Sequence, residues 1–240
     1  MARRRFFVDE PRRGEAELGG EEAEHLTRVL RAEAGQQYEI CDGARLYLAE
    51  IVEARKRSVR FRIVEELPVA EPAIRIALLM SLIKFERFEW MIEKATELGV
   101  ETIVPVHADR SEKGLELAAR KRVERWRKIA RAAGQQSRRV RLPQILPPLT
   151  LREAALRTEP SRFYLEETPG SPQLLKALLD LPRRADSVAV LIGPEGGWTE
   201  RERAVLLAAA WSPVSLGPQI LRAETAAIAA VALVQQALVE

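Results

Sequence analysis

One stretch decides the fold of this chain: from Ser187 to Trp198 it reads SVAVLIGPEGGW. Its first half, Ser187–Ile192, predicts a strand. Its second half, Gly193–Trp198, has three glycines in five residues, which lets the backbone approach a ligand closely. Thr199 and Glu202 have the spacing of a capping box, so a helix is expected to begin there. An ordinary strand-to-helix turn explains the same residues, and the spacing matches neither a Walker A loop nor a dinucleotide-binding motif.

Strands and helices alternate on both sides of that stretch. Further strands are predicted at Ile74–Ile83, Glu101–Val106, Arg162–Leu165 and Pro213–Leu216. Helices are predicted at Phe85–Leu98, Leu117–Ala133 and Ala223–Val239. Gly99 follows the first of them in the position of a C-cap glycine. Because Ile74–Ile83 is apolar almost throughout, it should be buried on both faces of a sheet. The alternation predicts an α/β fold with a mostly parallel sheet.

Residues 1–70 follow a different, β-rich pattern. Strands are predicted at Arg5–Val8, Tyr38–Cys41, Arg45–Ala54 and Val59–Val64, and a short helix at Glu21–Leu30. Asp42-Gly43 is a strong hairpin signal, because both residue types tolerate positive φ. Several short strands around one helix predict a small β-barrel. The two prolines of Leu67–Pro72 mark a linker, so the expected domains are residues 1–70 and 74–240.

The composition excludes several classes of protein. Cys41 is the only cysteine, which excludes a disulfide framework or a cysteine zinc site within one chain. His25 and His107 are the only histidines and lack metal-ligand spacing, so no metal is expected. The longest apolar run, Ala226–Val234, is shorter than the roughly 20 residues that span a bilayer. No signal peptide is visible, and a soluble cytoplasmic protein is expected.

The positive charge is unevenly distributed, although the formal net charge is only +3. Arginines crowd the N-terminal segment at positions Arg3, Arg4, Arg5, Arg12 and Arg13. The stretch Arg110–Arg141 carries twelve Lys or Arg against three Glu. Clustered cations predict a polyanionic partner such as nucleic acid. The alternative is that an arginine-rich composition simply covers solvated helix faces.

Ligands of open parallel sheets bind beyond the carboxyl ends of the strands. Three predicted loops lie at that edge: Glu166–Gly170, Gly193–Trp198 and Gly217–Arg222. Glu224 and Thr225 follow in the first turn of the last helix, where free backbone N–H groups can meet a polar ligand, although ordinary helix-start residues look the same. That helix is apolar almost all round, which favours burial against a second subunit.

Four motifs, in this order along the chain, resemble one family. They are KFERFEWMIEKATELG (Lys84–Gly99), QQSRR (Gln135–Arg139), LIGPEGGW (Leu191–Trp198) and LGPQILRAETA (Leu216–Ala226). They resemble the RsmE family of knotted SPOUT methyltransferases, which use S-adenosyl-L-methionine to methylate a uridine of 16S ribosomal RNA in the small ribosomal subunit. The resemblance covers the whole chain. It implies an N-terminal PUA-like β-barrel and a C-terminal SPOUT domain with a deep trefoil knot at about residues 162–240.

The resemblance also implies a cofactor site and a homodimer. S-adenosyl-L-methionine would be held mainly by main-chain groups of three loops. Their residues are Leu165 and Glu166; Ile192, Gly193, Pro194, Glu195, Gly196, Gly197 and Trp198; and Ser215, Leu216, Gly217, Ile220, Leu221, Arg222, Thr225 and Ala226. Family members act as dimers through the C-terminal domain, with a target site built from both subunits, which agrees with the apolar last helix.

The implied reaction transfers a methyl group to N3 of a uridine in 16S ribosomal RNA. A cation near the uracil oxygens would stabilise the charge that develops as N3 loses its proton. Arg222 is the first candidate for this cation, followed by Arg138 and Arg139. Glu224 is the candidate base, with Glu195 as the competitor, and the sequence does not choose between them. Either glutamate could instead cap a helix or bind the methionine amine of the cofactor.

RNA is expected to bind first through its phosphates. The expected contacts are Arg3, Arg4, Arg5, Lys84, Arg87, Arg138 and Arg139. Phe6, Phe7 and Trp198 could stack on unpaired bases, although core packing is favoured for Phe6 and Phe7. The competing interpretations are a non-catalytic ribosome-binding protein, an α/β enzyme that uses another nucleotide, and a related enzyme that methylates ribose or another RNA.

Overall fold

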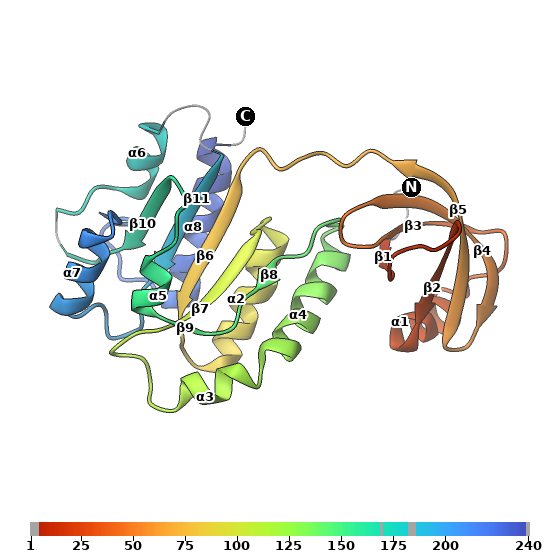
Figure 1. Ribbon diagram of the computed structural model, residues 1–240, viewed down its shortest axis with the longest axis horizontal. Coiled ribbons are helices and arrows are strands. Elements are labelled where there is room, and N and C mark those ends of the chain that lie inside the picture. The colour runs from red at the N-terminus through yellow and green to blue at the C-terminus, as the bar shows by residue number, and fades with distance from the viewer. Residues whose placement is uncertain (1–4, 169, 182–185, 239–240) are drawn as a thin grey trace. The chain divides into compact units, whose positions relative to one another are not determined.

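The computed structural model describes residues 5–168, 170–181 and 186–238, and Figure 1 shows its ribbon. These residues form two compact units. The first contains the residues up to Glu71 together with Gly134–Leu142, and the second contains Pro72–Ala133 and the residues from Pro143 onward. The sequence-based boundary near residue 70 did not include the return of Gly134–Leu142 to the first unit.

The first unit is a five-stranded, curled sheet (Figure 1). Its strands are β1 (Arg5–Phe7), β2 (Glu15–Gly19), β3 (Gln37–Cys41), β4 (Leu46–Arg55) and β5 (Ser58–Leu67). Their order in space is β1-β3-β4-β5-β2, antiparallel except for β1 against β3. The curled sheet confirms the predicted small β-rich unit, as a half-barrel whose edge strands are β1 and β2. Sequence reasoning missed β2, in which only Ala16 and Leu18 are buried.

A short helical segment packs on this sheet and changes type along its length. The helix α1 (Gly20–Glu24) is followed at once by a π-helix, η1 (His25–Val29). The helix predicted at Glu21–Leu30 is therefore correct in position but wrong in type over its second half. Phe6 and Phe7 are 3% and 2% exposed, which confirms that both pack in the core.

The predicted hairpin at Asp42-Gly43 joins β3 to β4. The Oδ1 atom of Asp42 accepts hydrogen bonds from the backbone N–H groups of Ala44 and Arg45, at 2.9 and 2.7 Å. Gly43 has a φ of +93°, a conformation that glycine adopts without strain. The hairpin is thus confirmed, with the aspartate holding the turn closed.

The second unit contains a parallel sheet. Its strands are β6 (Arg75–Ser81), β7 (Thr102–His107), β8 (Gln144–Ile145), β9 (Leu149–Thr150), β10 (Ser161–Leu165), β11 (Ser187–Ile192) and β12 (Ser212–Val214). Their order is β12-β10-β11-β6-β7-β8, with β9 also pairing with β7, and each of these pairs is parallel. β6 is buried on both faces, as its apolar sequence predicts. The α/β fold is therefore confirmed.

Helices cover both faces of this sheet (Figure 1). They are α2 (Phe85–Glu97), α3 (Leu115–Arg120), α4 (Val123–Gln136), α5 (Leu151–Ala155), α6 (Leu174–Leu179), α7 (Glu200–Ala208) and α8 (Ala223–Leu238). α2, α4, α6 and α8 share a hydrophobic core with one face of β6, and α5 and α7 share another core with the opposite face. Gly99 follows α2 with a φ of +89°, which confirms the predicted glycine stop.

The helix predicted at Leu117–Ala133 is in fact two helices, α3 and α4. The chain turns between them because the N–H groups of Lys121 and Arg122 bond to carbonyl groups three residues back, which tightens and ends α3. Trp126 of α4 then packs against Phe88 of α2, with ring centroids 4.7 Å apart. The predicted inner face of this segment is correct, whereas its continuity is not.

The last helix, α8, is buried on one side only. Its buried residues include Ala227, Ala230, Val231 and Val234, whereas Ile228 and Leu233 are only half-buried. A helix this apolar was expected to be buried all round. Within one chain that expectation is not met, because no described element covers the outer face fully.

The segment after β12 is enclosed by the chain that follows β10. The N–H of Ser215 donates to the carbonyl of Pro172 at 2.8 Å, and its carbonyl accepts from the N–H of Leu174 at 2.9 Å. On the other side, β12 pairs with β10. The chain then continues to α8, which packs against β11 and β6. Residues 161–165 and 172–174 therefore contact residues 212–215 on two sides, which is consistent with the trefoil knot that the resemblance implies.

Candidate functional site

A pocket of about 740 Å³ lies at the carboxyl ends of β10, β11 and β12. Its walls are residues 165–168, 192–198 and 215–223, together with Ala226 and three arginines from elsewhere. The structure therefore brings together the three predicted loops. Of the predicted cofactor-binding residues, Thr225 is exposed and does not line the pocket, and all the others do. The lining residues that were not among the predicted cofactor-binding residues are Glu167, Thr168, Pro218 and Gln219, which lie within two of the predicted loops, and Arg87, Arg110, Arg203 and Ala223, which lie outside the three loops.

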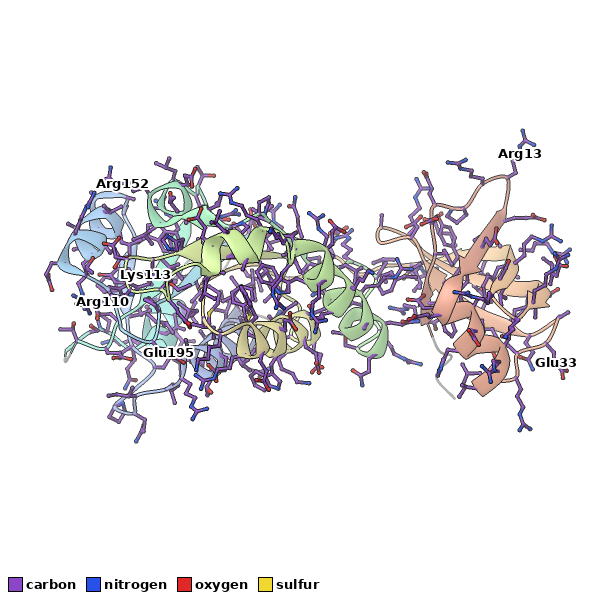
Figure 2. The ribbon with its side chains drawn as sticks, turned by 90° about the horizontal axis from the view of Figure 1, so that it is seen from below. Arg13, Glu33, Arg110, Lys113, Arg152 and Glu195 are labelled. Carbon is purple, nitrogen blue, oxygen red and sulfur yellow. The ribbon has the colours of Figure 1, made fainter. Side chains whose placement is uncertain are left out.

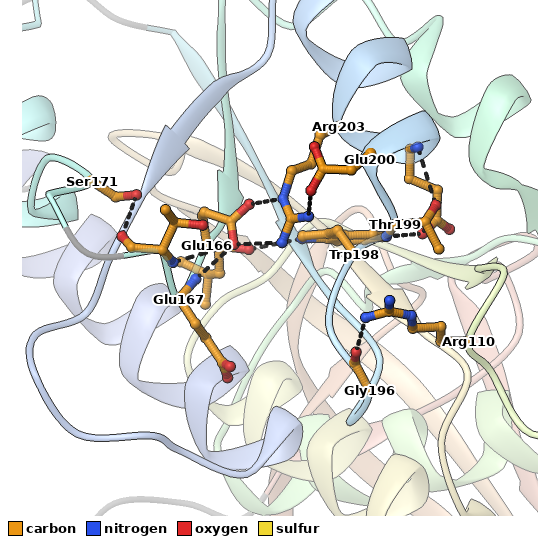
Figure 3. A network of polar contacts seen from close by, with 12 residues as sticks. Arg110, Glu166, Glu167, Ser171, Gly196, Trp198, Thr199, Glu200 and Arg203 are labelled. Atoms are coloured by element: carbon orange, nitrogen blue, oxygen red, sulfur yellow. Dashed lines mark hydrogen bonds and ion pairs between the residues drawn. The ribbon is translucent and has the colours of Figure 1, made fainter.

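Trp198 is part of the pocket floor and not a platform for RNA bases. It is 2% exposed, and its indole N–H donates to the carbonyl of Leu165 at 2.8 Å (Figure 3). Its ring also meets Tyr164 edge-on, at a centroid distance of 6.4 Å. Gly193 lies directly against this ring, since a Cβ there would be 3.0 Å from it. The stacking role considered for Trp198 is therefore wrong, because the ring is already used to join the first two loops.

Arg110 holds the glycine-rich loop from outside. Its Nη1 donates to the carbonyl of Gly196 at 2.7 Å (Figure 3), and a Cβ on Gly196 would lie 3.2 Å from the Cβ of Arg110. Sequence reasoning counted Arg110 only as part of a basic stretch. Its place just beyond the end of β7, at the same edge of the sheet, was the available signal.

The capping box that follows the glycine-rich loop is confirmed. The hydroxyl of Thr199 accepts from the N–H of Glu202, and the carboxylate of Glu202 accepts from the N–H of Thr199 at 2.8 Å. Glu202 is 4% exposed and also accepts from the N–H of Asp109 at 2.8 Å. One glutamate thereby caps α7 and ties the glycine-rich loop to the segment after β7.

Glu166 forms a buried ion pair with Arg203 (Figure 3). Arg203 donates from Nε to Oε2 at 2.6 Å and from Nη2 to Oε1 at 3.2 Å. The N–H groups of Glu167 and Thr168 also donate to Oε1, at 2.9 and 3.3 Å. Burial alone would raise the pKa of Glu166, but the Arg203 guanidinium and these N–H groups hold it below the ordinary value. This carboxylate therefore keeps the first loop in shape.

Glu224 is not among the residues that line the pocket: it is buried in the first turn of α8, next to the pocket residue Ala223, and its carboxylate is only partly hydrogen-bonded. It is 8% exposed, and its Oε1 lies 3.7 Å from the Nε of Arg87. Its Oε2 is buried and has no hydrogen-bond partner among the described residues. The guanidinium of Arg87 also pairs with Glu195 in the glycine-rich loop. Arg87 thus links α2 to the glycine-rich loop and to the start of α8. The Oε2 atom of Glu224 remains without a hydrogen-bond donor among the described residues, which is unusual for a buried oxygen.

The predicted RNA contact at Arg5 is wrong for its side chain. Arg5 pairs with Glu39 at 2.9 Å, is 11% exposed, and also donates to the carbonyl of Arg138. It therefore stabilises the first unit internally. Arg3 and Arg4, the neighbouring predicted contacts, lie outside the described residues.

The other predicted cations are distributed over both units. Lys84 is exposed directly before α2, and Arg222 is exposed on the pocket wall. Arg87 lies in the pocket and is only 31% exposed in its side chain. Arg138 and Arg139 belong to the first unit, where Arg138 has a φ of +60°. The structure thus brings Arg87 and Arg222 to the pocket and leaves Arg138 and Arg139 in the other unit.

The part of the chain that the structure describes contains neither a candidate metal-binding cluster nor a candidate membrane-spanning helix. No three His, Cys, Asp or Glu side chains there lie close enough together to hold a metal ion. None of the helices described is long and apolar enough to cross a bilayer.

The sequence of this chain matches known RNA methyltransferases in both of its units. Residues 70–235 match the family described as RNA methyltransferase domain, and residues 18–64 match the RNA methyltransferase PUA domain. The class is therefore an RNA methyltransferase with an accessory PUA domain. The Aquifex aeolicus protein named ribosomal RNA small subunit methyltransferase E is 31% identical, over 95% of this chain and 97% of its own. The Bacillus subtilis protein of that name is 30% identical, over 90% and 88%. This chain belongs to the ribosomal RNA small subunit methyltransferase E family.

Two solved structures are similar over nearly the whole chain. A Legionella pneumophila methyltransferase in complex with S-adenosylmethionine superimposes with a TM-score of 0.87 at 30% identity, covering 99% of this chain and 98% of its own. The Neisseria gonorrhoeae ribosomal RNA small subunit methyltransferase E, bound to S-adenosylmethionine, has a TM-score of 0.85 at 29% identity, covering 98% and 97%. Both the fold and the domain order are therefore shared with these relatives.

Proposed function

We propose that this protein is an S-adenosylmethionine-dependent methyltransferase that acts on 16S ribosomal RNA of the small ribosomal subunit. One observation carries the proposal, namely the pocket that three loops build at the carboxyl edge of the parallel sheet. The names and the bound cofactor of the relatives support it. A ribosomal RNA substrate would place the protein in the cytoplasm.

The residues present fit this cofactor. A volume of about 740 Å³ is within the range of small-molecule sites, roughly 300–1,000 Å³. Glycines at 193 and 196 let the loop pack closely against Trp198 and Arg110, since a Cβ there would lie 3.0 and 3.2 Å from these side chains. Glu167 and Glu195 line the pocket and suit the positively charged amine and sulfonium of this molecule. The proposed binding residues are those predicted from the resemblance, except the exposed Thr225.

When bound, S-adenosylmethionine supplies a methyl group on a positively charged sulfur that is already activated for transfer. The protein's own residues then have to align the acceptor and exclude water. Trp198 and the Leu165 carbonyl close the floor between the first two loops. Arg87 and Arg110 fix the glycine-rich loop from two sides, which keeps its backbone groups in place.

The proposed acceptor is N3 of a uridine, whose N–H must lose its proton. Glu224 suits the role of base because its Oε2 is buried and unpartnered within the described residues. Glu195, the competing candidate, is 51% exposed in its side chain and paired with Arg87. Arg222 is exposed on the pocket wall and is the proposed cation for the charge that spreads onto the uracil oxygens.

The proposal includes a homodimer formed through the second unit. The outer face of α8 offers the half-buried Ile228 and Leu233, and Ile220 on the pocket wall is 82% exposed. A second copy that covers these residues would also bring its own surface to the pocket. Light scattering at twice the mass of the chain is expected, and a concentration-independent monomer would contradict the dimer.

The test is methyl transfer from labelled S-adenosylmethionine to 16S RNA and to small subunits that lack the modification. We expect 3-methyluridine in the product nucleosides, identified by mass spectrometry. Gly196→Val should abolish transfer, because the new side chain would displace Arg110 and block the backbone. Gly19→Val is the matched control, since Gly19 has open space around it. No label transfer and no cofactor binding by calorimetry would refute the enzyme.

A further inference from the structure

One segment of the second unit accounts for the net positive charge of the chain. Residues 110–131 contain nine Lys or Arg and three Glu, a net charge of +6. Because the whole chain carries +3, all other residues together carry −3. A concentration of charge of this kind on an otherwise acidic molecule attracts a polyanion to one place. The segment comprises the loop after β7, α3 and most of α4.

This segment begins at the pocket. Arg110 lines the pocket and bonds to Gly196. Figure 2 labels Arg110 and Lys113 on the loop that leads into α3. The start of α4 is also close to the pocket, because the guanidinium of Arg122 lies 4.3 Å from the ring centroid of Phe85, in the first turn of α2. Arg87, two residues further along α2, lines the pocket itself.

Internal acids neutralise only part of this charge. Glu89 binds both Arg122 and Arg125, at 3.0 and 2.8 Å. Glu116 pairs with Arg120, and Glu124 with Arg127. The lysines of the segment are different. Lys113, Lys121 and Lys128 are exposed and form no ion pair with any residue that the structure describes.

We propose that Lys113, Lys121 and Lys128 form a basic band that binds the RNA backbone beside the target nucleotide. This inference rests on the proposed function and adds to it the path by which the RNA reaches the pocket. Four arginines of the segment, Arg120, Arg122, Arg125 and Arg127, are paired with glutamates of α2, α3 and α4. The lysines are flexible point charges, which suit phosphates of varied sequence and geometry. Lys113 lies three residues after the pocket residue Arg110, so an RNA strand bound to the band would pass close to the pocket.

The test compares two triple variants by binding to transcribed 16S RNA between 50 and 200 mM salt. Lys113→Ala/Lys121→Ala/Lys128→Ala removes the band. Arg152→Ala/Lys176→Ala/Arg201→Ala is the control, with three exposed cations removed from α5, α6 and α7. The band variant should bind RNA at least about tenfold more weakly and lose about two units of the salt slope, since each single-strand phosphate contact contributes roughly 0.7. Calorimetric affinity for S-adenosylmethionine should not change in either variant.

The outcomes separate the band from the proposed function. If the wild-type protein methylates RNA and both triple variants bind RNA equally well, the band is refuted and the enzyme stands. If the wild-type protein binds RNA through the three lysines but transfers no methyl group, the band is supported and the enzyme is refuted. Equal competition by poly-glutamate and by RNA, charge for charge, would overturn RNA as the partner of this surface.

Discussion

Two buried glutamates, Glu166 in the pocket wall and Glu224 next to the pocket residue Ala223, have very different surroundings. Glu166, in the first loop, is 7% exposed, and both of its carboxylate oxygens have donors from Arg203 and the backbone. Glu224, at the start of α8, is 8% exposed, and Arg87, the cation that pairs with it among the described residues, is 3.7 Å away. The two carboxylates are buried to nearly the same extent, but only Glu166 has hydrogen-bond donors for both of its oxygens.

The difference agrees with a structural role for Glu166 and with the proposed reactive role of Glu224. A buried charge that has all its hydrogen bonds fixes the fold around it. A buried oxygen without a donor costs folding free energy, commonly about 1–3 kcal/mol. Glu224 lies in the first turn of α8, between the pocket residues Ala223 and Ala226. We therefore infer that Glu224 meets its missing donor in a bound molecule, whereas Glu166 does not need one.

Substituting Glu224 should have the largest effect on catalysis. Glu224→Gln keeps the shape of the side chain and removes the proposed base, so the single-turnover methylation rate is expected to fall about 10²- to 10⁴-fold. The melting temperature should change by less than about 4 °C, because the side chain adds little to stability now. Rapid-quench methylation at saturating cofactor, with thermal unfolding of the same sample, measures both.

The same variant also tests the alternative role of Glu224. If the carboxylate binds the methionine amine, the cofactor dissociation constant would rise while the rate at saturation stayed near the wild-type value. That result would contradict the base. Glu166→Gln is the matched substitution, since it changes the same group at the same burial, and it should lower the melting temperature more than the rate.

Removing Glu166 altogether should cost stability. Glu166→Ala leaves Arg203 with only the exposed Glu200 as an acidic partner. Because the Arg203 side chain is 26% exposed, water relieves part of the loss, and a decrease of about 2–3 kcal/mol in the free energy of unfolding is expected. Urea denaturation measures it. Glu200→Ala, whose side chain is 92% exposed, should cost less than about 1 kcal/mol. Equal costs for the two variants would contradict the structural role of Glu166.

The ion pair of Glu166 also predicts a pH dependence. The pKa of Glu166 is lower in the folded protein than its ordinary value of 4.5, so its ionised form favours folding. Its contribution is fully present above about pH 4.5 and is lost as the pH falls through the folded-state pKa. The stability difference between wild type and Glu166→Gln should therefore be constant at neutral pH and shrink below pH 4.5. If the stability difference between wild type and Glu166→Gln grew on acidification, the pKa of Glu166 would not be lowered by folding, which would contradict the prediction.

Local sequence predicted those parts of the fold that local chemistry decides. Apolar runs such as Val188–Ile192 form buried strands, and Thr199 with Glu202 forms the expected cap. β2 was missed because three of its five residues are Glu or Gly, and only pairing with β5 makes them a strand. The break between α3 and α4 was missed because Lys121 and Arg122 both favour helices. Whether such segments form a strand or interrupt a helix depends on contacts with residues far away in the chain.

The same limit applies to the site. The three loops could be predicted because strand ends share one edge of a parallel sheet. Arg87 and Arg203 could not be assigned to them, since their partners lie 108 and 37 residues away in the chain. Arg110 could have been assigned, because it follows β7 at the same edge of the sheet. Arginines are abundant here, so composition gave no reason to choose Arg87 or Arg203. Trp198 was equally ambiguous, because an indole suits a stacked base as well as a protein core.

The smallest expected effect concerns Trp198, which joins the loop of Glu166 to the glycine-rich loop. Trp198→Phe removes the N–H donor to the Leu165 carbonyl while keeping most of the buried ring. A loss of about 1 kcal/mol in unfolding free energy is expected, because one hydrogen bond is lost and the carbonyl faces a ring edge. RNA affinity should stay unchanged, since the ring is buried and does not reach the RNA. A weaker RNA complex with unchanged stability would contradict this assignment and return Trp198 to the group of base-stacking residues.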